Sequence, residues 1–269
     1  MPTQYPHAVS SETKHKVLIT GSAGRIGQAV AEEVRRRGHH VRGFDRLPSP
    51  SATESIIGDI ANFDRINTAA AGMDTIIHLA ATPDDDDFMT TLLPNNIIPV
   101  HHILEGARAN NIQRVILASS GQVIWQHQFH GPFPVRVDAP LTPRYWYAVT
   151  KIFAEFAGQI YANTHKMDVI AVRLGACPRD RAAVDFIGND EITRDVYLSP
   201  GDAGRFFAQA VEAKSGFGFQ IVYVCSKPVL RDIFDLEPTR RLLAYQPQDR
   251  WPEGLPPEIL GDKPVPRAP

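Results

Sequence analysis

Cysteine is scarce in this 269-residue chain, which has only Cys177 and Cys225, and the formal net charge is no more than −2. Two cysteines in or beside apolar runs argue against a disulfide and predict buried thiols. The lack of a basic excess argues against a nucleic-acid partner. No apolar run approaches the roughly 20 residues that a membrane helix needs. These absences favour a cytoplasmic protein with no nucleic-acid or membrane partner.

What the chain does contain is a glycine-rich segment between Lys16 and Gly27. The apolar run Val17–Ile19 is typical of a buried parallel strand, and an amphipathic helical pattern begins at Arg25. Glycines between a strand and a helix let the backbone turn tightly and let a pyrophosphate come close. The helix N-terminus offers N–H groups and a positive dipole end to the anion. A tight turn without a ligand is the alternative. We predict that a dinucleotide contacts Gly21, Gly24, Arg25, Ile26 and Gly27.

Strand-like and helix-like patterns alternate along most of the chain. The strand candidates are Lys16–Thr20, Val41–Asp45, Ser55–Gly58, Thr75–Ala80, Arg114–Ser119, Val169–Gly175 and Gln220–Cys225. The helical patterns are Arg25–Arg37, Phe63–Ala71, Asn95–Asn110, Tyr147–His165 and Asp202–Ala213. A run of β-α-β units predicts an α/β fold, a Rossmann-type doubly wound parallel sheet with helices on both faces.

The chain is expected to form a single domain between residues 15 and 246. Residues 1–14 are polar and contain no apolar signal core, so we expect a disordered lead-in. Residues 247–269 are rich in proline, which predicts an irregular wrap or a partly disordered tail. The carboxylate run Asp84–Asp87 is interpreted as a solvated, mobile loop rather than a metal site, and no metal is expected.

The glycine spacing G-x-x-G-x-x-G resembles that of the short-chain dehydrogenase/reductase superfamily, in particular its extended, sugar-active branch of NAD-dependent epimerases and dehydratases. Asp45 ends the second strand candidate, where an acidic residue accepts hydrogen bonds from the adenosine ribose. A carboxylate there repels a 2′-phosphate, which favours NAD over NADP. Arg46 follows directly and can pair with such a phosphate, so NADP stays open as the second choice.

The resemblance also implies contacts for three further segments of the cofactor end. An aspartate at the place of Asp59, beside Ile60, contacts the adenine in the resembled family. At the end of the fourth strand candidate, small residues let the backbone run beside the phosphates and the nicotinamide ribose; these are Leu79, Ala80 and Ala81, after a structural His78. The segment that begins at Asn96 looks like the family's N-V-x-G-T-x-N-x-L-E helix, with Pro99 and His102 in place of the glycine and the second asparagine.

Tyr147 and Lys151 are the residues expected to carry out the reaction. They are four residues apart in a helical pattern and therefore share a helix face. Tyr147 is the expected proton acceptor. A phenolate base near neutral pH needs a pKa well below the ordinary tyrosine value of about 10. Lys151 and the positive nicotinamide ring are suitable sources of that field, and Lys151 also grips the nicotinamide ribose in the resembled family. Alignment with the family selects Ser120 as the donor to the substrate oxygen, with Ser119 as the fallback.

Fewer than 100 residues follow Arg173–Cys177, which leaves only a small C-terminal substrate lid, around residues 176–200. The pattern is closest to that of uronate dehydrogenases, which oxidise C1 of a hexuronic acid to a lactone with NAD. The similarity lies in residues 118–120, 147–151, 173–177 and 242–247. Where those enzymes have an asparagine and a histidine that touch the sugar, this chain has Gly121 and Gln122. The expected substrate residues are Thr82, Gln122 and Arg194, with Arg179 and Arg181 as competitors for the carboxylate.

Three functions follow from these motifs. The first is an NAD-dependent oxidoreductase that acts on a small sugar or sugar acid. The second is an epimerase or dehydratase, in which oxidation is transient and NAD stays bound. The third is a non-enzymatic dinucleotide-binding regulator, which ranks last because Tyr147 and Lys151 are both present. The expected partners are a small-molecule substrate and further copies of the chain, in a homodimer or larger homo-oligomer.

Overall fold

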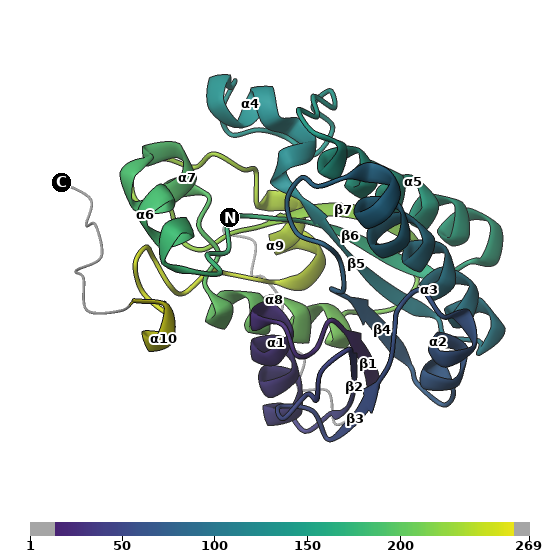
Figure 1. Cartoon of the computed structure of the whole chain (residues 1–269). Helices are drawn as coiled ribbons and strands as arrows, with labels where there is room; N and C mark the ends of the chain where they lie inside the picture. The colour runs from purple at the N-terminus through teal and green to yellow at the C-terminus, as the bar shows by residue number, and fades with distance from the viewer. Residues whose placement is uncertain (1–13, 261–269) are drawn as a thin grey trace, which may run out of the picture.

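The computed structural model of the chain describes residues 14–260. Residues 1–13 of the expected lead-in (1–14) and residues 261–269 of the tail therefore lie outside the described residues. Seven strands form one parallel sheet in the order β3-β2-β1-β4-β5-β6-β7 (Figure 1). They are β1 (Lys16–Thr20), β2 (His40–Asp45), β3 (Glu54–Ile57), β4 (Thr75–His78), β5 (Arg114–Ser120), β6 (Asp168–Leu174) and β7 (Phe219–Val224). The predicted doubly wound sheet is confirmed.

Both faces of the sheet are covered by helices, which explains why the strands are continuous apolar runs. Successive side chains of a strand point to opposite faces, and in β1 Val17 and Ile19 pack in one buried cluster while Leu18 packs in another. The helices packed on the first face are α1 (Arg25–Arg36) and α8 (Pro200–Glu212). Those on the second face are α2 (Phe63–Ala70), α3 (Ile98–Ala109) and α5 (Trp146–His165). The five predicted helical patterns correspond to these five helices.

The structure also contains short helical segments that the sequence patterns do not indicate. They are η1 (Phe88–Ile97), η2 (Gly121–Ile124), α4 (Trp125–His130), α6 (Arg181–Asn189), α7 (Glu191–Asp195), α9 (Glu237–Leu243) and α10 (Pro257–Leu260). The wide helix η1 runs directly into α3, so the helical stretch predicted from Asn95 begins at Phe88. Within residues 14–260, no helix combines the length and the apolarity that crossing a membrane requires.

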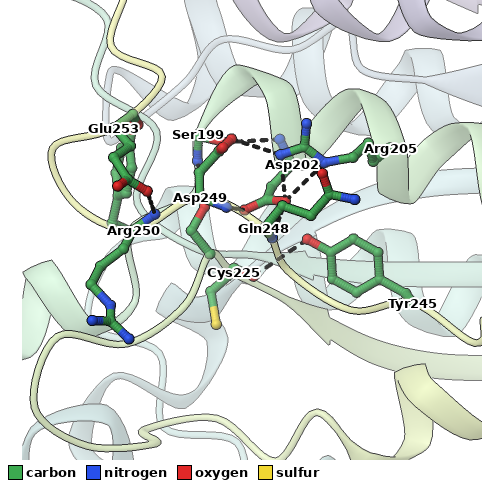
Figure 2. A network of polar contacts seen from close by, with 11 residues as sticks. Ser199, Asp202, Arg205, Cys225, Tyr245, Gln248, Asp249, Arg250 and Glu253 are labelled. Atoms are coloured by element: carbon green, nitrogen blue, oxygen red, sulfur yellow. Dashed lines mark hydrogen bonds and ion pairs between the residues drawn. The ribbon is translucent and has the colours of Figure 1, made fainter.

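The first part of the proline-rich tail is an irregular segment bound to α8, as Figure 2 shows. The carboxylate of Asp202 is fully buried and accepts hydrogen bonds from the backbone N–H groups of Gln248 (2.8 Å) and Asp249 (3.0 Å). Arg205 donates to both Asp202 and Asp249, at 2.7 Å each. Beyond this anchor, Trp251 packs in a cluster with Ile187 of α6. The tail therefore supports the helix that closes one side of the candidate site.

Candidate active site

The glycine loop after β1 has the geometry of an anion cradle. Gly21 has φ +73°, and a Cβ there would lie 2.6 Å from the backbone nitrogen of Ala80, so a side chain has no room. A Cβ on Gly27 would collide with the carbonyl oxygen of Gly21. Gly24 is the extended N-cap residue of α1, and no side chain caps that helix end. Because nothing in the loop blocks the first turn of α1, the cradle fits a dinucleotide diphosphate.

The end of β2 brings Asp45 to this cradle. Its carboxylate accepts hydrogen bonds from the backbone N–H groups of Ala23 (3.0 Å) and Leu47 (3.2 Å). Arg46 instead donates to the side-chain oxygen of Asn95 (3.0 Å) and lies 3.4 Å from the carboxylate of Asp59. Asp45 therefore lies beside the glycine loop, whereas the guanidinium of Arg46 is bound by Asn95 and Asp59.

A cavity of about 430 Å³ extends from the glycine loop past the ends of β4, β5 and β6 to α6 and α7. The predicted site residues that line it are Gly21, Gly24, Arg25, Ile26, Gly27, Leu79, Ala81, Ser120, Gln122 and Tyr147. The predicted residues that do not line it are Asp45, Asp59, Ile60, Ala80, Thr82, Asn96, Lys151 and Arg194. The cradle and the Ser120–Tyr147 pair therefore face one continuous space.

Two buried polar residues near β4 fix the cavity wall without lining it. Asn96 accepts a hydrogen bond from the Thr82 N–H (2.8 Å) and donates to the Thr82 carbonyl (3.0 Å) and to the Thr150 hydroxyl (3.2 Å). It therefore ties the loop after β4 to α5. His78 bonds through Nδ1 to the Thr20 hydroxyl at 2.8 Å, and burial, followed by the charge of Lys151, lowers its pKa to about 3. His78 is a neutral, packed histidine, as the sequence predicts.

Tyr147 and Lys151 lie on one face of α5, as their spacing predicts. The ammonium of Lys151 is 5.5 Å from the centroid of the Tyr147 ring and donates to the Ala118 carbonyl at 3.0 Å. Burial lowers the pKa of Lys151 to about 8. Burial also raises the pKa of Tyr147, as does the Asp84 carboxylate, while a hydrogen bond with Ser120 and the charge of Arg179 lower it. Among the described residues burial outweighs the nearby positive charge, so Lys151 alone does not supply the depression that we expect from Lys151 and the nicotinamide ring together, and the share of the ring stays a prediction.

The two serines at the end of β5 have different partners. The Ser119 hydroxyl donates to Glu155 at 2.6 Å, and Glu155 forms a buried bidentate pair with Arg173, at 2.8 and 2.9 Å. The Ser120 hydroxyl accepts the Gln122 N–H at 3.1 Å and lies beside Tyr147. Both serines line the cavity, but the Ser119 hydroxyl is held by Glu155, so the geometry favours Ser120 as the serine that meets a substrate.

The three candidate arginines lie in different environments. Arg194 is buried and donates to the Gly188 carbonyl at 3.3 Å, inside the α6–α7 hairpin and away from the cavity lining. Arg181 pairs with Asp185 on α6 at 2.9 Å. Arg179 lines the cavity and forms an ion pair with Asp84, which lies in the loop after β4 and also lines the cavity. The geometry thus favours Arg179 over Arg194 as the arginine next to a substrate.

The cavity has further lining residues that the motifs do not indicate. Three are aromatic or apolar groups on short helices, namely Trp125 and Phe129 of α4 and Phe186 of α6. Cys177 also lines it, and burial raises the pKa of this thiol to about 12, so it is uncharged at neutral pH. The segments that carry these aromatic rings are six and nine residues long. Such short segments have too few turns for a clear hydrophobic period.

Comparisons with known proteins agree with this geometry. The model of a family described as the NAD dependent epimerase/dehydratase family matches residues 17–177. An L-arabinose 1-dehydrogenase (NAD(P)(+)) of Haloferax volcanii is 28% identical over 251 residues, which cover 87% of this chain and 96% of that protein. A uronate dehydrogenase of Pseudomonas putida is 29% identical over 168 residues, 60% of this chain and 61% of that protein. The solved structure of a mutated uronate dehydrogenase has a TM-score of 0.73 and 25% identity, covering 88% of this chain and 83% of that one.

Proposed function

This chain belongs to the NAD dependent epimerase/dehydratase family, and from that premise we propose that it is an NAD-dependent oxidoreductase acting on a CH–OH group of a small sugar or sugar acid. The observation that carries the proposal is that the glycine cradle and the Ser120–Tyr147 pair line one cavity. The named activities of the relatives, on arabinose and on uronates, support the same substrate class. NAD, when bound, supplies the hydride acceptor.

The residues that would hold the dinucleotide include some that line the cavity and some that lie beside it. The glycine loop binds the diphosphate and Asp45 accepts from the adenosine ribose, with Asp59 and Ile60 at the adenine. The end of β4 lies beside the phosphates and the nicotinamide ribose through Leu79, Ala80 and Ala81. Asn96 contributes indirectly, since it fixes Thr82 and thereby the loop that follows β4.

The proposed reaction requires the chain to remove the proton of the substrate hydroxyl and to orient its oxygen. Tyr147 takes the proton from the substrate hydroxyl, and Ser120 donates to that oxygen as it becomes a carbonyl. Burial raises the pKa of Tyr147, so the phenol would need the positive charge that a nicotinamide ring supplies when bound in order to act as a base near neutral pH. Lys151, with its pKa near 8, remains largely protonated at pH 7 and keeps a cation near the ring. Positioned acid–base catalysis of this kind contributes about 10²- to 10⁴-fold.

The alternative function is an epimerase or dehydratase, the two activities that the family description names. Both use the same oxidation, but only a dehydrogenase releases NADH on every turnover. The deciding experiment measures NADH formation with a panel of aldoses, uronates and polyols, with Tyr147→Phe as the inactive control. Stoichiometric NADH with one of these sugars supports the proposal. Product formation with less than one NADH per turnover supports the epimerase or dehydratase.

An exposed apolar stripe on α5 supports a homodimer. Its side chains recur every three or four residues along one face of the helix and are 38–58% exposed: Trp146, Val149, Phe153, Phe156 and Ile160. A contiguous apolar face of this kind marks an interaction site. We propose that it packs against the same stripe of a second copy. Phe156→Glu is expected to give monomers in sedimentation experiments, whereas Leu230→Glu, at an equally exposed leucine away from α5, leaves the assembly unchanged.

A further inference from the structure

An ion pair joins two loops that line the candidate active site. Asp84 lies in the loop after β4 and Arg179 in the loop after β6, and both line the cavity. The other carboxylate oxygen of Asp84 is 3.4 Å from the side-chain nitrogen of Gln122. Arg25 of the glycine loop donates to the Arg179 carbonyl at 3.1 Å. Through these contacts the Asp84–Arg179 pair links Arg25, at the cofactor end, to Gln122, at the substrate end.

This pair is accessible to ions from solution. Its side chains are 57% and 45% exposed, for Asp84 and Arg179 respectively. Exposed ion pairs add little stability and are screened by salt, so a second carboxylate can compete for the guanidinium. The Glu155–Arg173 pair offers the contrast, because its side chains are only 4% and 2% exposed. A buried bidentate pair of that kind is structural, whereas the Asp84–Arg179 pair is exchangeable.

Arg179 is also the cation that a substrate anion would meet. The described residues that line the cavity include two arginines, Arg25 and Arg179. Arg25 belongs to the glycine loop, at the phosphate end, while Arg179 lies close enough to Tyr147 for its charge to act on the phenol. A planar guanidinium binds a carboxylate through two parallel hydrogen bonds. The carboxylate that now occupies this position belongs to Asp84.

We propose that Asp84 is a specificity-determining residue that occupies Arg179 in the free enzyme and is displaced when the carboxylate of a sugar acid binds Arg179. The inference rests on the proposed function and names its substrate class. Asp84 acts as an internal competitor, so its charge sets how strongly the site prefers anionic over neutral sugars. Asp85 next to it accepts the backbone N–H of Tyr147 at 3.0 Å. Movement of this loop therefore also reaches the catalytic end of α5.

The test compares a uronate with the matching neutral sugar, galacturonate with galactose, in variants that change one charge. Asp84→Asn removes the competitor and is expected to raise the ratio of kcat/KM for galacturonate to kcat/KM for galactose about threefold, through a lower KM for galacturonate. The loss of the Asp84 charge also lowers the pKa of Tyr147, an effect that both sugars share and that cancels in the ratio. Arg179→Gln is expected to lower the ratio of kcat/KM for galacturonate to kcat/KM for galactose at least about tenfold. The ratio is the readout because the Arg179 charge also lowers the pKa of Tyr147 and therefore acts on both sugars alike. In the double variant the gain from Asp84→Asn should disappear, because the two residues act through one contact.

Two variants that make the same charge changes outside the cavity serve as matched controls. Asp86→Asn makes the same charge change in the same acidic run, at a carboxylate that accepts the Asp87 N–H and does not line the cavity. Arg136→Gln breaks an exposed pair with Asp138, and neither residue lines the cavity. Both variants should leave kcat/KM for galacturonate and for galactose unchanged. If Asp86→Asn matches Asp84→Asn, or if the gain survives in the double variant, the inference is wrong.

A binding measurement separates this inference from the proposed function. Galacturonate is titrated calorimetrically into the enzyme saturated with NADH, so that no turnover occurs. Tighter binding by Asp84→Asn and weaker binding by Arg179→Gln support the exchange even if no sugar is oxidised, in which case only the proposed function fails. If sugars are oxidised while both variants bind galacturonate like the native chain, the proposed function stands and the exchange at Arg179 is refuted.

Discussion

The two ends of the cavity are built in different ways. At the cofactor end, backbone geometry within one short segment does most of the work, since Gly21 and Gly27 have no room for a side chain. At the substrate end, side chains from loops far apart in sequence meet, as Asp84, Gln122 and Arg179 do. A motif can specify the first arrangement by itself. The second exists only after the sheet has brought the loops together.

The largest expected effect lies where the two ends meet. Tyr147→Phe removes the proton acceptor but keeps the ring, so kcat should fall about 10²- to 10⁴-fold, while the affinity for NAD changes little. Turnover assays with the sugar identified by the panel, together with fluorescence titration of NAD, measure the two quantities. Tyr145→Phe is the matched control, because that ring stacks with Arg144 outside the site. A near-native rate for Tyr147→Phe would assign the proton transfer to another base.

The sequence predicts the strands and the cradle because their physical causes are local. Buried parallel strands are short apolar runs, and a glycine that must adopt φ +73° can be recognised in its own segment. The choice between Ser119 and Ser120 already needs the fold, since only the pleat of β5 and the position of Glu155 show which hydroxyl is committed. Predicting the orientation of the Arg194 side chain requires still more knowledge of the fold. Its turn of helix packs against α6, which directs the guanidinium to the Gly188 carbonyl instead of the cavity.

The cofactor end can be tested through cofactor choice. Asp45 lies beside the glycine loop, while Arg46 is engaged by Asn95 and Asp59. We therefore expect NAD to bind at least about tenfold more tightly than NADP, a difference of about 1.4 kcal/mol. Fluorescence titration of both cofactors gives the ratio, and Asp45→Asn should reduce it. Equal or tighter binding of NADP would mean that Arg46 leaves its partners to bind the 2′-phosphate. The position of Asp45 in the sequence would then not be enough to predict which cofactor binds.

The smallest expected effect concerns Arg194, the residue for which sequence position and structure differ most. Its guanidinium makes one hydrogen bond, at 3.3 Å to Gly188, and its Nε has no hydrogen-bond partner among the described residues. Arg194→Gln should therefore change the ratio of kcat/KM for galacturonate and galactose by less than about twofold, within the range of a substitution that touches neither substrate. The same ratio measured for Arg179→Gln provides the comparison. A loss confined to galacturonate in Arg194→Gln would show that the α6–α7 hairpin turns this arginine into the cavity when substrate binds. The sequence-based choice of Arg194 as the carboxylate contact would then be correct.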